Sequence, residues 1–128
     1  MNWYSSLTLS PLNPPPYVFG PVWTVLYIMI AYSFYTYTQH RPTTVGLVAF
    51  AIHMISNFVW SPLFFVLRNP TAALIDIVVM VITLVWVLYE FRKRSKLAFW
   101  LLVPYFAWVC FATYLNAYIV LNNPPTVL

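Results

Sequence analysis

Four apolar segments, each long enough to cross a lipid bilayer, account for nearly all of this chain of 128 residues. They extend over residues 17–38, 43–67, 71–91 and 97–121. A transmembrane helix needs about 20 mostly apolar residues to cross roughly 30 Å of hydrocarbon, and all four segments meet that length. We therefore expect an all-α integral membrane protein: a single transmembrane bundle in residues 17–128, preceded by an extended proline-rich segment in residues 1–16.

Composition excludes several other classes of protein. Hydrophobic residues make up 62% of the chain and charged residues only 6%, a balance that does not suit a soluble surface. The net charge of +4 comes from a few basic residues confined to the connectors, so we expect no nucleic-acid partner. The single cysteine, Cys110, lies inside the last apolar segment, which excludes a disulfide scaffold and a Cys-rich metal site. We find no nucleotide-binding, zinc or Ser–His–Asp signature and expect no metal.

The basic residues predict the orientation in the membrane. Four crossings place both termini on one side together with Arg68, whereas the other side carries the remaining basic residues: Arg41, Arg92, Lys93, Arg94 and Lys96. Because loops rich in Lys and Arg stay in the cytoplasm, we expect both termini outside and the basic connectors inside. A bacterial inner membrane fits this bias best, and a mitochondrial outer membrane is the alternative. The short connectors imply that consecutive helices are antiparallel neighbours.

The amino-terminal segment differs from a flexible linker, because it is rich in proline rather than glycine and serine. Its consecutive prolines favour an extended left-handed conformation and forbid a helix. Aromatic residues flank the prolines on both sides. We expect a lid over the outer mouth of the bundle, and a disordered tail is the alternative. The residues assigned to the lid are Trp3, Tyr4, Pro14, Pro15 and Tyr17.

Polar and aromatic side chains recur at helical spacing within the apolar segments. Polar groups are costly in hydrocarbon and usually face the interior of a bundle, so these faces are expected to point inward. Chain direction brings several of them to one level in the outer half. The residues expected to line a ligand site there are Trp23, Tyr27, Asn57, Trp60, Asp76, Trp108, Ala112, Leu115 and Asn116. His53 shares the face of the second segment, either as an axial haem ligand or as a hydrogen-bond partner of a neighbouring helix.

A cavity with these walls would suit a flat apolar ligand. Aromatic rings offer stacking faces, alanine leaves room, and an amide or carboxyl can bind a polar edge. The alternative is that the asparagines only join helices by hydrogen bonds while the tryptophans fill space.

Four sequence motifs, in this order along the chain, resemble those of the translocator protein family, also called the tryptophan-rich sensory protein (TspO/MBR) or peripheral benzodiazepine receptor family. The motifs are Trp3-Tyr4-x-x-Leu7; Pro14-Pro15-x-Tyr17-Val18-Phe19-Gly20-Pro21-Val22-Trp23-Thr24-x-Leu26-Tyr27; Asn57-x-x-Trp60-x-x-x-Phe64-Phe65; and Pro104-Tyr105-x-x-Trp108-x-x-Phe111-Ala112-x-x-Leu115-Asn116. The resemblance extends from Trp3 to about Asn123.

This resemblance implies a dimeric membrane protein of five helices that binds porphyrins and haem, sterols or benzodiazepine-type drugs beneath a long loop. Residues 3–16 would correspond to that loop and the four apolar segments to family helices two to five. The family's first helix has no counterpart ahead of Trp3, either because this form is naturally short or because the reading frame is truncated. One wall of the expected pocket is then absent unless a dimer partner or lipid supplies it. Positions matching the family pocket are Trp23, Asn57, Trp60, Asp76, Ala112 and Leu115. The sterol motif of animal members lacks its basic residue after Tyr118 here.

Together these observations predict a membrane binding protein for a tetrapyrrole or a similar flat ligand, acting in sensing, sequestration or transport, and a homodimer. Porphyrin or haem is expected as a ligand, without a tightly bound cofactor. One alternative is a light-dependent enzyme that degrades porphyrin with Trp23 as its redox partner. Another is a small proton-coupled exporter that uses Asp76.

Overall fold

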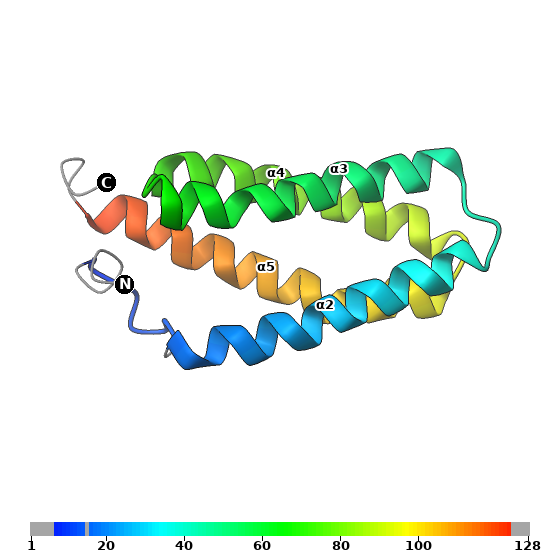
Figure 1. The fold of residues 1–128 in the computed structure, drawn as a ribbon, viewed down its shortest axis with the longest axis horizontal. Helices are drawn as coiled ribbons and strands as arrows, with labels where there is room; N and C mark the ends of the chain where they lie inside the picture. The colour runs from blue at the N-terminus through cyan, green and yellow to red at the C-terminus, as the bar shows by residue number, and fades with distance from the viewer. Residues whose placement is uncertain (1–6, 15, 124–128) are drawn as a thin grey trace.

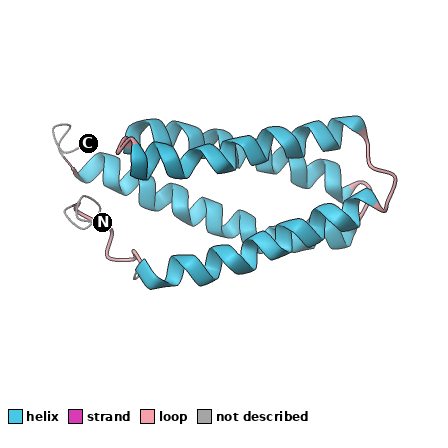
Figure 2. Ribbon diagram, in the orientation of Figure 1, coloured by secondary structure: helices cyan, strands magenta, loops and turns pink. Residues whose placement is uncertain are grey.

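The computed structural model describes residues 7–14 and 16–123, and in this part of the chain helices joined by short connectors form an elongated bundle without strands (Figure 1, Figure 2). The helices are α2 (Pro16–Thr38), α3 (Thr44–Ser61), α4 (Pro70–Arg92) and α5 (Lys96–Asn122), and a π-helical turn, η1 (Pro62–Val66), continues α3. With η1 included, each helical segment ends within one residue of its predicted bounds. The predicted all-α bundle is therefore confirmed.

Three of the four helices begin at a polar residue that caps them. The side chains of Thr43, Asn69 and Ser95 each accept a hydrogen bond from a backbone N–H three residues on, at 3.0, 3.1 and 3.2 Å. Such caps satisfy amide donors that the first turn of a helix leaves unpaired. They fix where α3, α4 and α5 start and so keep the connectors short.

Pro62 changes the hydrogen bonding at the end of α3. Proline lacks an N–H, so it cannot donate to the carbonyl four residues before it, which loosens a helix at that point. The amide of Leu67 instead reaches back five residues to the carbonyl of Pro62, at 2.9 Å, which is π-helical bonding. The wider turn carries Phe64 into the bundle, where it is 2% exposed.

The packing of the helices is uneven. α4 packs against both α3 and α5, and α2 packs mainly against α5 while touching α3 little. Figure 1 shows α2 lying apart from α3 toward the end that carries the two termini. The hydroxyl of Ser33 ties α2 to the start of α5 by donating to the carbonyl of Ala98 at 2.6 Å. Stacking of Phe34 on Phe50, with ring centroids 4.4 Å apart, joins α2 to α3 in the half farther from the termini.

Large apolar side chains cover the outside of the bundle. Ile28, Ile55, Ile75 and Ile82 are all more than 60% exposed, which suits lipid and not water. All four helices are long and apolar enough to span a membrane. We conclude that the chain is an integral, multi-pass membrane protein. Both described ends of the chain lie at one end of the bundle, and the α2–α3 and α4–α5 connectors lie at the other (Figure 1).

Candidate functional site

A cavity of about 350 Å³ opens in the half of the bundle nearest the termini, between α2, α3 and α5. Its walls are mostly apolar and aromatic. Eight of the nine residues predicted for the ligand site line it: Trp23, Tyr27, Asn57, Trp60, Trp108, Ala112, Leu115 and Asn116. The helical spacing and chain direction therefore bring these eight residues from three helices around one space.

Asp76, the ninth predicted residue, does not line the cavity. Its side chain lies between α4 and α3, where the hydroxyl of Ser56 donates to both the backbone carbonyl and the Oδ1 atom of Asp76 at 3.1 Å. Its Oδ2 atom is buried and has no hydrogen-bond partner among the described residues. The inward-facing side of α4 is thus divided between α3 and the cavity, and Asp76 falls on the part that meets α3.

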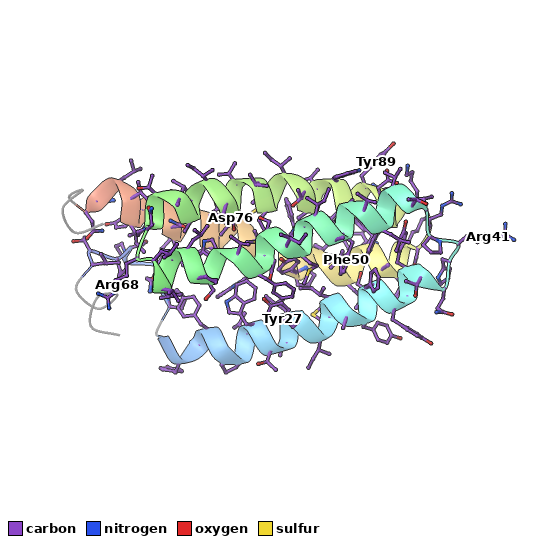
Figure 3. All side chains as sticks on the ribbon, turned by 45° about the horizontal axis from the view of Figure 1, so that its top comes forward. Tyr27, Arg41, Phe50, Arg68, Asp76 and Tyr89 are labelled. Atoms are coloured by element: carbon purple, nitrogen blue, oxygen red, sulfur yellow. The ribbon has the colours of Figure 1, made fainter. Side chains whose placement is uncertain are left out.

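A chain of hydrogen bonds runs from the cavity into the core. The hydroxyl of Tyr27 donates to Oδ1 of Asn57 at 2.6 Å, and Nδ2 of Asn57 donates to the hydroxyl of Tyr105. That hydroxyl lies 2.8 Å from Nε2 of His53, whose Nδ1 atom lies 3.1 Å from the carbonyl of Met80. His53 and Tyr105 are 1% and 0% exposed. Figure 3 shows Tyr27 pointing from α2 toward α3, where this chain begins.

The donors and acceptors of this network favour one assignment. The Nδ1 atom of His53 lies 3.1 Å from the carbonyl of Met80, which can only accept, and 3.0 Å from the hydroxyl of Thr83, which itself donates to a backbone carbonyl. With the proton on Nδ1 both contacts are hydrogen bonds, and Nε2 accepts from Tyr105. The hydroxyl oxygen of Tyr105 is then left to accept from the amide nitrogen of Asn57. The side-chain carbonyl of Asn57 must therefore face the cavity. The network fixes Asn57 as a hydrogen-bond acceptor in an otherwise apolar wall.

His53 is consequently a hydrogen-bonded core residue, the second of its two predicted roles. Both ring nitrogens have partners, and His53 does not line the cavity. Among the described residues no group of three or more His, Cys, Asp or Glu side chains could hold a metal ion. We do not assign His53 as an axial ligand.

Asn116 and Trp60 stiffen the opposite wall. The indole N–H of Trp60 donates to Oδ1 of Asn116 at 3.0 Å, and the amide of Asn116 donates to the carbonyl of Pro70 at 2.9 Å. One side chain thereby joins α3, α4 and α5. Both ends of this amide are bonded within α3, α4 and α5, so Asn116 supports the wall. The amide of Asn57 is also bonded at both ends, but the partner of its carbonyl is the Tyr27 hydroxyl on α2.

Trp23 lies at the centre of an aromatic cluster on the other side of the cavity. Its ring lies 5.6 Å from that of Tyr27 and 6.4 Å from those of Tyr105 and Trp108, measured between centroids. The Trp108 ring stands at 90° to the Trp23 ring. The indole N–H of Trp108 is buried without an acceptor among the described residues. The cavity thus has aromatic faces and edges, an acceptor on Asn57 that bonds the Tyr27 hydroxyl, and a lining tryptophan whose indole N–H is buried and unpaired.

Residues 7–14 cross the end of the bundle beside the cavity. Leu7 is buried against Phe64 and Ile119, and the hydroxyl of Ser10 lies 2.7 Å from that of Tyr114. Asn123 holds Thr8 by two hydrogen bonds. The backbone N–H of Thr8 donates to Oδ1 of Asn123 at 2.8 Å, and Nδ2 of Asn123 donates to the backbone carbonyl of Thr8 at 3.2 Å.

Asn13, in the same segment, lines the cavity. Of the residues assigned to the lid, Pro14 is half-buried, and Tyr17 is 79% exposed and does not line the cavity. Trp3, Tyr4 and Pro15 lie outside the described residues.

The sequence analysis missed part of the lining. The further lining residues are Asn13, Phe19, Ser61, Phe64, Phe65, Ile77, Met80, Val109 and Ile119. Ser61 and Phe64 share the helical spacing of Asn57 and Trp60, which could have identified them. Asn13 could not have been found in this way, because a loop residue has no periodicity to follow.

Comparison with known proteins gives one consistent result. The model of the TspO/MBR family matches residues 1–121. The tryptophan-rich protein TspO of Chlorobaculum tepidum is 42% identical over 128 residues, covering 96% of this chain and 81% of its own. That of Archaeoglobus fulgidus is 36% identical, covering 94% and 80%. The human translocator protein is 32% identical, covering 91% of this chain and 72% of its own.

Proposed function

Because the chain belongs to the TspO/MBR family, we propose that it is a membrane binding protein for a tetrapyrrole such as a porphyrin or haem, acting in sensing, sequestration or transport. The observation that carries the proposal is the cavity, which has aromatic walls from three helices and one acceptor, the side-chain carbonyl of Asn57, held from behind. An apolar cleft with a few fixed polar groups is the usual form of a small-molecule site.

The aromatic cluster supports a flat ligand. Offset and edge-on contacts between aromatic rings are favourable, and Trp23 and Trp108 offer a face and an edge at right angles. A donor on the ligand's periphery would bind the carbonyl of Asn57 in place of the Tyr27 hydroxyl. The indole N–H of Trp108 is buried and unpaired, so a ligand acceptor would reach it only if the ring turned.

The cavity is too small for a tetrapyrrole unless α2 moves outward. Its volume of about 350 Å³ is near the lower end for small-molecule sites, and a tetrapyrrole with its side chains is larger. Near the termini, α2 is joined to α3 chiefly through Tyr27, which binds Asn57 and stacks on Phe58. Loss of these contacts would let α2 move outward and admit the ring between the two helices.

The proposed orientation follows from charge. Arg68 lies at the cavity end and Arg41 at the opposite end (Figure 3), where Figure 1 shows the two connectors that hold or adjoin all five other basic residues. With the basic connectors in the cytoplasm, the cavity would open in the outer half of the membrane. A bacterial inner membrane fits this arrangement.

Titration of the purified protein with protoporphyrin, followed by quenching of tryptophan fluorescence, tests the proposal. We expect saturable quenching with a micromolar or lower Kd. Trp23→Phe and Asn57→Ala should each weaken it, whereas Trp100→Phe should not, because Trp100 is 62% exposed and outside the cavity. Quenching that rises linearly, or that responds equally to all three changes, would refute a specific site.

A further inference from the structure

The end of the bundle opposite the cavity carries a second, cationic hollow. It is open, has a volume of about 380 Å³, and is lined by Gln39, His40 and Arg41 of the α2–α3 connector and by Lys93 and Arg94 of the α4–α5 connector. Figure 1 shows the two connectors together at this end, and Figure 3 shows Arg41 projecting from it. Nothing in the proposed tetrapyrrole site uses these residues.

Tyr37, fully buried, holds the two connectors in fixed relative positions. Its ring stacks on Phe91 at the end of α4, with centroids 4.0 Å apart and planes 10° apart. Its hydroxyl accepts from the backbone N–H of Thr43 at 3.1 Å, at the start of α3. The backbone N–H groups of Arg94 and Ser95 donate to the carbonyl of Phe91 at 3.0 and 2.8 Å. The hollow is therefore built on hydrogen-bonded backbone.

The charges in this region are not balanced by the protein. Glu90 pairs with Lys93 at 3.0 Å, and Arg92 lies over the ring of Phe99 at 5.4 Å. Asp76, the only other acidic residue in the sequence, lies beside the cavity half of the bundle. Arg41 and Arg94 have no ion pair among the described residues. Two guanidinium groups from different connectors thus line one hollow without an anion.

We propose that this hollow binds the phosphate of an anionic phospholipid headgroup. Guanidinium groups bind phosphate oxygens through paired, charge-assisted hydrogen bonds, and basic pockets between transmembrane helices bind such headgroups. The apolar surface next to the hollow favours a lipid over free phosphate. Tyr89, Leu97 and Trp100, on the adjoining turns of α4 and α5, are 64%, 52% and 62% exposed and would contact its acyl chains.

Native mass spectrometry of the purified protein in detergent, with dioleoyl phosphatidylglycerol or zwitterionic dioleoyl phosphatidylcholine as the probe, tests this proposal. We expect phosphatidylglycerol to bind at least about tenfold more tightly, a difference equivalent to 1.4 kcal/mol. Combining Arg41→Gln with Arg94→Gln should abolish the preference. Arg68→Gln, which removes the single basic residue of the opposite end, is the matched control and should leave it unchanged.

Three results would overturn the assignment. These are equal binding of the two lipids, a preference that survives in the double variant, and displacement of phosphatidylglycerol by millimolar inorganic phosphate, which would make the site one for free phosphate. Arg41→Lys with Arg94→Lys should retain part of the preference, because the charge remains while the planar fork is lost. Helical circular dichroism of both double variants shows that they are folded, and the protoporphyrin titration should be unaffected in each.

Discussion

Gly46 is the position where the structure predicts the largest effect from the smallest change. It is buried at the start of α3, and a Cβ atom there would overlap the hydroxyl of Tyr37 and come within 2.8 Å of its ring carbon Cζ. Tyr37 cannot simply turn aside, because its ring is stacked on Phe91 and its hydroxyl accepts from Thr43. Gly46→Ala should therefore displace the side chain that joins the two connectors.

The expected magnitude is the balance of opposing effects. Overpacking a close-packed interior costs about 1–3 kcal/mol, and losing the hydrogen bond to Thr43 costs about 0.5–1.5 kcal/mol. Replacing glycine by alanine within a helix returns about 1 kcal/mol. We expect a net loss of about 0.5–3.5 kcal/mol in the free energy of unfolding, because the two costs outweigh the helical gain.

Loss of helical circular dichroism with rising SDS in mixed micelles gives that free energy. Gly20→Ala is the matched control, since nothing lies within 4 Å of a Cβ atom at that helical position, and it should be neutral or stabilising. In a Tyr37→Phe background the overlap with the hydroxyl disappears and only the contact with Cζ remains, so Gly46→Ala should cost less than it does in the wild type, a coupling that a double-mutant cycle measures. If Gly46→Ala is as stable as Gly20→Ala, or if the cycle shows no coupling, the packing described around Tyr37 is wrong.

Three further substitutions test other parts of the structure. His53→Leu removes the acceptor of the Tyr105 hydroxyl and should cost about 1–3 kcal/mol in the same unfolding assay. It should also weaken protoporphyrin binding, although His53 does not line the cavity. Unchanged binding would mean that Asn57 is oriented without His53. Ser33→Ala removes the hydrogen bond to the carbonyl of Ala98 and should cost about 0.6 kcal/mol, the average for such bonds between membrane helices. This loss of stability should be smaller than that of His53→Leu, and a larger loss would contradict the prediction. Asp76→Asn should leave the Kd for protoporphyrin unchanged, because the carboxyl lies between α3 and α4, and a large change would return Asp76 to the binding site.

Much of the fold could be predicted because lipid simplifies the problem. In hydrocarbon every backbone group must bond internally, so four apolar segments of sufficient length imply four helices. The capping residues Thr43, Asn69 and Ser95 mark the starts of three of them in the sequence. A looser turn could be expected at Pro62, but its π-helical form depends on which carbonyl the amide of Leu67 reaches.

The candidate site could be predicted only in part, for a different reason. Helical spacing tells which side chains share a face of a helix, and chain direction tells how deep in the membrane they lie. Together the two predict that Trp23, Asn57 and Ala112 lie around one space, as they do in the structure. Neither helical spacing nor chain direction tells which neighbouring helix a given face packs against. Asp76 has a suitable spacing and depth, but its side chain packs toward Ser56, a contact that depends on how α4 is rotated against α3.

The central claim, that the cavity itself receives the ligand, is tested most directly by filling it. Ala112 lines the cavity on α5, whereas Ala107 on the same helix is exposed toward lipid. Isothermal titration with protoporphyrin should give a Kd at least about tenfold weaker for Ala112→Phe, equivalent to 1.4 kcal/mol, and the wild-type Kd for Ala107→Phe. A folded Ala112→Phe protein that binds protoporphyrin as tightly as the wild type would contradict the account.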